Sequence, residues 1–112
     1  MTPRLTSEMV ASALVRRVNA AGGSAMVLAK GDASAGSFLI VTLERGAGVR
    51  LWERGYDQAG AAALVPTGPV DADESAVGAY WQRRRERDPD LWVVELDIAG
   101  AERFAAETIL GR

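Results

Sequence analysis

Residues 37–55, SFLIVTLERGAGVRLWERG, place the strongest constraint on what this chain can fold into. Two runs rich in β-branched and aromatic residues, 38–45 and 49–54, flank the flexible link Gly46-Ala47-Gly48. Strand-forming residues on both sides of a glycine-containing link are typical of a β-hairpin. The chain is therefore expected to contain an antiparallel sheet against which the other segments pack.

Helical patterns lie on both sides of this hairpin. Residues 7–21 predict a first helix, which begins with Ser7 as its N-cap and ends at Gly22-Gly23. A second helix is expected from Asp71, which stands three residues before Glu74 as in a capping box, to about Arg87. Pro89 forces the helix to close near residue 88, because the residue before a proline avoids helical geometry.

Further strands are predicted at 24–32, weakly at 61–66, and at 91–98, where residues 92, 94, 96 and 98 share an apolar face and the other face is partly solvated. The tail, 100–112, is compatible with helix or strand, and we favour a short helix with Phe104 docked. The resulting order is α-β-β-β-(β)-α-β-α. It predicts a single α+β domain over 1–112, with a small, mainly antiparallel sheet of four to five strands packed against two main helices.

Composition excludes several kinds of chemistry. The 112 residues include no cysteine and no histidine, which removes disulfides, thiol nucleophiles, histidine acid–base catalysis and the usual zinc ligands. The net charge of −2 provides no overall field to attract nucleic acid or anionic lipid. The apolar stretch 9–15 is too short for a signal peptide, and no run approaches the roughly twenty apolar residues of a membrane span. A cytoplasmic protein is expected.

Four arginines at positions 83, 84, 85 and 87 precede the turn Asp88-Pro89-Asp90. On a helical wheel they do not share one face, and Arg84 falls among the apolar residues Val77, Tyr80 and Trp81. An anion site would present its cations together. The pattern favours a structural joint, in which Arg84 lays its stem over the core and pairs with Asp88, Asp90 or Glu95, of which we favour Asp88.

A second candidate surface lies on the strand 49–54, where Arg50, Trp52 and Arg54 share one face. An aromatic ring between two cations is the arrangement that binds single-stranded nucleic acid, with the ring stacking on a base. The same spacing occurs where a tryptophan covers a sheet and arginines extend around it. With one tryptophan and no second aromatic on a neighbouring strand, covering of the sheet is the favoured interpretation. Which face of this strand is buried stays open.

Carboxylate and glycine motifs indicate turns and caps. The sequence VDADES at 70–75 lacks the glycine and the distal glutamate of a calcium loop. The sequence GDASAGS at 31–37 lacks the Gly-Lys-Ser/Thr ending of a phosphate loop. We therefore predict no metal site, no cofactor and no catalytic residue.

Three stretches, PRLTSEMVASALVRR, KGDASAG and RDPDLWVVELD, occur in an order that resembles a bacterial family of short proteins, domain of unknown function 1491. The resemblance covers nearly the whole chain. It implies a small cytoplasmic protein of the alphaproteobacterial type. The family has no assigned activity, ligand or catalytic residue, so the resemblance transfers none.

The sequence favours a non-enzymatic binding or protein-interaction module with an unidentified protein partner or a second copy of itself. The expected surface combines Arg50, Trp52 and Arg54 with Arg83, Arg87 and Asp90, if the fold brings them together. Weak RNA or DNA association through the Arg-Trp-Arg face is the alternative, and an enzyme built on carboxylates ranks third.

Overall fold

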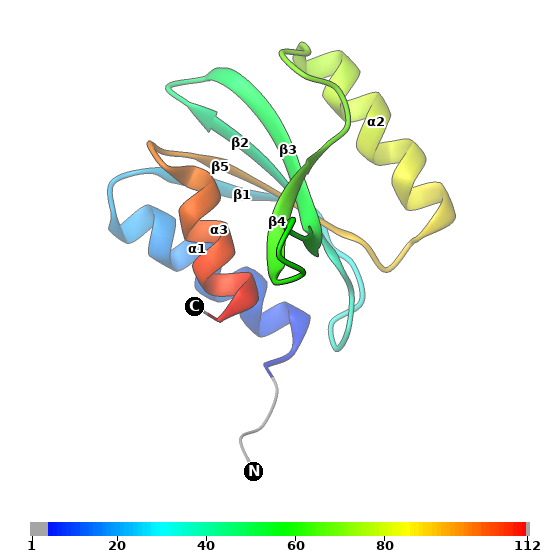
Figure 1. The fold of residues 1–112 in the computed structure, drawn as a ribbon. Helices are drawn as coiled ribbons and strands as arrows, with labels where there is room; N and C mark the ends of the chain where they lie inside the picture. Colours follow the sequence, from blue (N-terminus) through cyan, green and yellow to red (C-terminus); the bar gives the residue numbers. More distant parts are fainter. Residues whose placement is uncertain (1–4, 112) are drawn as a thin grey trace.

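The computed structural model describes residues 5–111, so Pro3 and Arg4 of the first family-like stretch lie outside the described residues. The elements are α1 (Ser7–Ala20), β1 (Ser24–Ala29), β2 (Phe38–Glu44), β3 (Ala47–Tyr56), β4 (Ala62–Thr67), α2 (Glu74–Arg87), β5 (Trp92–Asp97) and α3 (Ala101–Leu110) (Figure 1). The predicted α+β class and element order are confirmed. The weakly predicted strand forms β4, and the tail is a helix.

The five strands are ordered β1-β5-β2-β3-β4. Only β2 and β5 run parallel, and every other neighbouring pair is antiparallel. The mainly antiparallel sheet is thus confirmed. Because β5 inserts between β1 and β2, the segment 30–37 does not form a tight hairpin. It crosses over the start of β5 instead.

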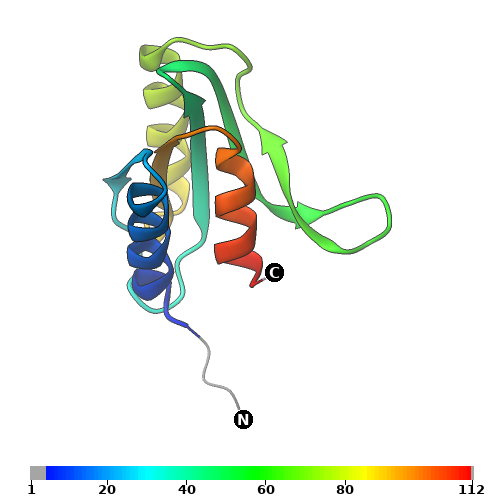
Figure 2. The same ribbon diagram turned by 90° about the vertical axis from the view of Figure 1, so that its left-hand side faces the viewer.

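Helices cover both faces of the sheet. Figures 1 and 2 show α1 and α3 on one face and α2 on the other. The first core cluster joins Leu14 and Val18 of α1 to Ile40, Val94 and Leu96 of the sheet and to Ala101 and Ala105 of α3. The second joins Val77 of α2 to Leu39, Val41, Leu51, Leu91 and Val93. The partly solvated face predicted for β5 is therefore wrong at Leu91 and Val93, which α2 buries, and correct at the half-buried Glu95 and Asp97.

The N-caps of α1 and α2 lie one and two residues from their predicted positions. Thr6 caps α1 by accepting a hydrogen bond from the Met9 amide, whereas Ser7 is the first helical residue and donates its hydroxyl to the Gly36 carbonyl at 2.7 Å. Asp73 caps α2 through the Ala76 amide at 2.8 Å. Asp71 cannot continue a helix because its φ is +51°.

The β2–β3 turn lies at Arg45-Gly46, one residue before the predicted link. Both residues have positive φ, 52° and 73°, as the two-residue type I′ hairpin turn requires. The Asp97 carboxylate accepts hydrogen bonds from both backbone amides, at 2.7 and 2.9 Å. This contact from β5 stabilises an arginine in a conformation that glycine would adopt more readily.

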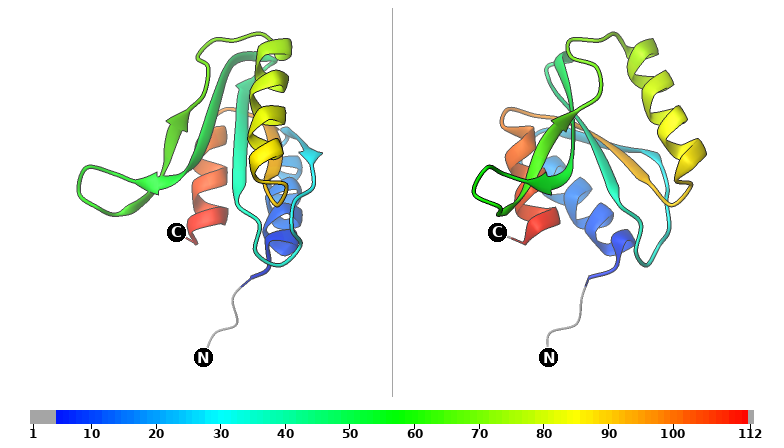
Figure 3. Two further views of the ribbon diagram at one scale, coloured as in Figure 1. Left: turned by 90° about the vertical axis from the view of Figure 1, so that its right-hand side faces the viewer. Right: turned by 45° about the vertical axis from the view of Figure 1, so that its right-hand side comes forward.

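The far end of the β3–β4 hairpin, residues 54–64, projects from the body of the molecule and is called the arm below (Figures 2 and 3). Its tip is closed by Asp57, whose carboxylate accepts from the Ala59 and Ala61 amides at 2.9 Å each. The Asp57 amide in turn donates to the Ala61 carbonyl. The arm is therefore an ordered hairpin held by its own turn.

The three family-like stretches meet where segment 30–37 crosses β5. The Asp32 amide donates to the Asp90 carbonyl, and the Trp92 indole donates to the Asp32 carbonyl at 2.8 Å. The amides of Ser7 and Glu8 donate to carbonyls of the same segment. These motifs therefore hold one structural junction together. Within residues 5–111, no helix combines the length and the apolar character needed to traverse a bilayer.

Candidate functional site

The predicted surface residues divide between the two sides of the sheet. Trp52 packs against the cluster on the α1–α3 face, while Arg83 and Arg87 are exposed on α2, across the sheet. Asp90 is exposed in the turn that follows α2. The fold does not bring the six residues into one surface. Of the three β3 residues, Arg54 alone lines a groove together with residues at the end of α2, and this groove is described below.

Trp52 is half-buried and already has partners on its own chain. Its indole N–H donates to the Thr42 hydroxyl at 2.9 Å, and the Arg50 guanidinium lies 5.4 Å from the ring centroid. A nucleic-acid base stacking on that side of the ring would have to displace Arg50. The geometry therefore favours a tryptophan that covers the sheet. The more deeply buried face of β3 is the opposite one, where Leu51 is 1% exposed in the second core cluster.

Arg84 pairs with Glu53, and not with Asp88, Asp90 or Glu95 as predicted. It donates to Glu53 of β3 at 3.1 Å and to the Tyr80 hydroxyl at 2.9 Å, and Tyr80 also contacts the Thr67 hydroxyl. Long helical side chains point toward the helix N-terminus, away from Asp88, which explains the change of partner. Burial acts to lower the pKa of Arg84, but the Tyr80 hydrogen bond and the Glu53 charge outweigh it and raise that pKa.

Arg84→Ala is expected to lower the free energy of unfolding by about 1–2 kcal/mol, through lost stem packing and the lost hydrogen bonds. A double-mutant cycle with Glu53→Gln in urea should attribute less than about 1 kcal/mol to the pair itself, because both side chains are about one-third exposed. An Arg84→Ala protein as stable as the parent would contradict this assignment.

Sequence reasoning did not single out Arg85. Its guanidinium donates to the Leu91, Lys30 and Pro89 carbonyls at 3.1, 2.9 and 3.1 Å. The side chain therefore ties the end of α2 to β5 and to the loop after β1. The available signal was its place in the last helical turn, from which arginine can reach free carbonyls.

A groove of about 760 Å³ lies at the end of the sheet where the chain begins α1, and we call it the end groove. Its polar side chains include Arg54, Glu53, Arg84 and Asp88. The lining, drawn from six segments of the chain, is Leu5–Ser7, Val10, Ser34–Phe38, Glu53, Arg54, Leu64, Arg84, Asp88, Leu91 and Thr108–Gly111. Glu53 and Arg84 neutralise each other, whereas Arg54 is exposed and has no ion-pair partner among residues 5–111.

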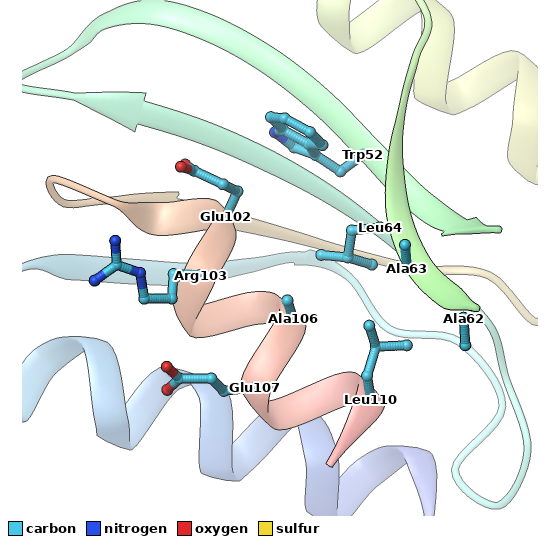
Figure 4. A pocket seen from close by; sticks show the side chains of 9 residues that line it. All are labelled: Trp52, Ala62, Ala63, Leu64, Glu102, Arg103, Ala106, Glu107 and Leu110. Atoms are coloured by element: carbon cyan, nitrogen blue, oxygen red, sulfur yellow. The ribbon is translucent and has the colours of Figure 1, made fainter. Parts of the chain in front are cut away.

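A smaller and more apolar hollow of about 420 Å³ lies between the arm and α3, and we call it the arm hollow. Figure 4 shows Trp52 and the strand residues Ala62, Ala63 and Leu64 on one side, and Ala106 and Leu110 of α3 on the other. Leu64 and Leu110 line both this hollow and the end groove. The arm hollow and the end groove therefore share part of their lining beside the arm.

Two acidic residues, Glu95 and Asp97, lie near the C-terminal end of β5. Burial raises the pKa of Glu95, and the neighbouring charges of Glu74 and Asp97 raise it further. Asp97 is occupied by the β2–β3 turn. Within the described part of the chain, no group of three or more acidic side chains is arranged to hold a metal ion.

Glu95→Gln is expected to stabilise the protein at pH 7 by less than about 1 kcal/mol, because Glu95 is only partly buried and its charge is screened. The raised pKa of Glu95 means that the folded state binds this proton more tightly than the unfolded state does. Ionising Glu95 therefore lowers the free energy of unfolding as the pH rises above 4.5, the ordinary pKa of a glutamate. The gain should therefore vanish below about pH 4. Urea unfolding at several pH values, with the exposed Glu86→Gln as control, would show a pH-independent difference if this is wrong.

Comparison with known proteins places the chain. Residues 5–106 match the family model for the protein of unknown function DUF1491. A crystal structure of a DUF1491 family protein from Caulobacter crescentus CB15 is 30% identical, with a TM-score of 0.76, over 90% of this chain and 94% of that one. An NMR structure of a DUF1491 family protein from the same organism is 31% identical, with a TM-score of 0.72, over 92% of this chain and 94% of that one. The solution structure of Atu0922 from A. tumefaciens is 31% identical, with a TM-score of 0.65, over 85% of this chain and 86% of that one. No curated protein matches. The chain, as its three sequence stretches indicated, belongs to the DUF1491 family, whose function is unknown.

Proposed function

We propose that the protein is a non-catalytic binding module and that the end groove is its binding surface. The observation that carries the proposal is Arg54, an exposed guanidinium without an ion-pair partner among the described residues, beside apolar side chains in a groove of about 760 Å³. A cytoplasmic location belongs to the same proposal, since a chain without cysteine gains no disulfide from an oxidising compartment.

The lining indicates the chemistry of the partner. Arginine binds carboxylates through two parallel hydrogen bonds, so Arg54 favours an acidic side chain or a chain terminus. Leu5 is 59% exposed and lines the same groove, which favours an apolar side chain on the same partner. A protein segment with an acidic residue close to apolar ones meets both requirements. Nucleic acid lacks the apolar side chains.

The test is selection of peptides from a random displayed library on the purified protein. Selected peptides should carry aspartate or glutamate near apolar residues and shift the amide resonances of groove residues. Arg54→Ala should weaken their binding about tenfold, equivalent to ~1.4 kcal/mol. Arg83→Ala removes the same charge from the exposed face of α2 and should leave affinity unchanged. Equal binding by the parent and Arg54→Ala, or a library that yields no binder, would refute the end groove.

A further inference from the structure

Among residues 5–111, the arm ends in a strand edge that has no neighbouring strand. β4 is the last strand of the sheet, so only one of its edges pairs, with β3. The Asp57 amide donates to the Ala61 carbonyl, which places residue 61 in the bonded set of the ladder. Because that set alternates along an antiparallel pair, Ala63 is bonded to β3, and the N–H and C=O groups of Ala62 and Leu64 point away from it.

The position of Pro66 is consistent with this alternation. Pro66 also limits the length of the edge with which a further strand can pair. It belongs to the same outward set as Ala62 and Leu64, and a proline in a strand places its nitrogen on the unpaired side. Since it has no N–H, a strand added along β4 cannot be bonded fully beyond Leu64. The arm hollow is lined by three consecutive residues of this edge strand, Ala62, Ala63 and Leu64.

We propose that this edge pairs with the same edge of a second copy of the chain, antiparallel and centred on Ala63. Ala62 of each copy then lies opposite Leu64 of the other, and about four main-chain hydrogen bonds form. The contact is self-complementary and is closed by a twofold axis. Figure 3 shows that the arm projects from the body of the molecule, and the proposed contact uses this projecting part of each copy.

The side chains of the arm fit a second copy. β4 carries no charged residue, so no like charges oppose each other across the axis. Tyr56 is 75% exposed and lies opposite Ala62 in the β3–β4 register, which places it in one cross-strand row with Leu64 of the second copy. The small Ala62 leaves room for the tyrosine ring to lean toward that leucine, beside the arm hollow.

The pairing also stabilises the arm itself. A two-stranded hairpin without further cover is marginal in water, whereas the dimer joins two arms into a four-stranded ribbon. The contact is small, so the dimer is expected to form and dissociate with concentration. Leu64 also lines the end groove, but Arg54, on which that proposal rests, lies on β3 and not on the paired edge, so failure of either proposal leaves the other standing.

Sedimentation velocity over a range of concentrations tests the proposal. The apparent mass should rise from the 11.9 kDa of one chain toward twice that value. Over the same range, the amides of Ala62 and Leu64 should gain protection from hydrogen exchange. A monomer at every concentration, or a dimer in which these two amides exchange as fast as in the monomer, would overturn the proposal.

Variants at the edge sharpen the test. Ala62→Pro removes one outward N–H without touching the bonds to β3 and should abolish the dimer, whereas Ala62→Ser keeps the N–H and should preserve it. If circular dichroism shows that the proline variant is unfolded, Tyr56→Ser decides. That side chain is exposed, so the fold should tolerate the change while the dimer dissociation constant rises roughly tenfold. Dimers unaffected by Tyr56→Ser would refute the role of the arm.

Discussion

Trp92→Ala should lower the free energy of unfolding by about 3–5 kcal/mol, as expected when a large buried aromatic is truncated. Trp92 is 3% exposed, and its ring stacks on Phe38 with centroids 6.0 Å apart. Its indole also donates to the Asp32 carbonyl, the hydrogen bond that holds segment 30–37 over β5. The variant therefore leaves a cavity and removes a hydrogen bond that orders a loop.

Urea denaturation followed by circular dichroism measures the effect. Since domains of this size are stable by only about 5–15 kcal/mol, the variant should be partly unfolded well below the melting temperature of the parent. Trp92→Phe is the matched control, because it keeps most of the ring and loses the indole N–H, at a cost of about 1–3 kcal/mol. A loss below about 1 kcal/mol for the alanine variant would mean that Trp92 is not the core residue described above.

The sequence predicted the elements better than the arrangement of the sheet. The hairpin 38–54, the helix ending before Pro89 and the burial of Trp92 follow from local patterns, because turn residues and alternation act within a few positions. The insertion of β5 between β1 and β2 has no local signature. It is decided by which strand buries both of its faces, and the near-continuous apolar run 91–94 is consistent with that position once α2 is known to cover its second face.

The candidate site was less predictable because its contacts are distant in the sequence. Arg84 donates to Glu53, and Arg85 donates to the Lys30 carbonyl. Both partners lie outside α2 in the sequence, so a helical wheel of α2 cannot predict them. The wheel did show correctly that Arg84 lies beside Tyr80 and that the four arginines do not share one face, since Arg84 and Arg85 are half-buried and Arg83 and Arg87 are exposed. It could not show that Arg54 would share a groove with the end of α2, since that depends on the path of β3 through the sheet.

Gly31→Ala should destabilise the protein by at least about 3 kcal/mol, the upper end of what overpacking costs, because the obstacle is backbone and cannot rotate away. A Cβ atom at residue 31 would lie 1.9 Å from the Asp90 carbonyl oxygen, which also accepts the Asp32 amide. Relief would require segment 30–37 to separate from β5. The sequence indicated only a turn here, whereas the structure requires glycine for close approach.

Gly78→Ala provides the matched control, since it adds the same methyl group elsewhere. Gly78 lies within α2, where a Cβ would meet nothing within 4 Å, and alanine is favoured over glycine in a helix by roughly 0.5–1 kcal/mol. The two substitutions should therefore move the urea midpoint in opposite directions. Gly31 lies in one family-like stretch and Asp90 in another. If Gly31→Ala alone loses stability, the close contact between these two residues would give both sequence motifs a structural role. Equal stability of the two variants would show that segment 30–37 can leave β5 at little cost and would remove that reason.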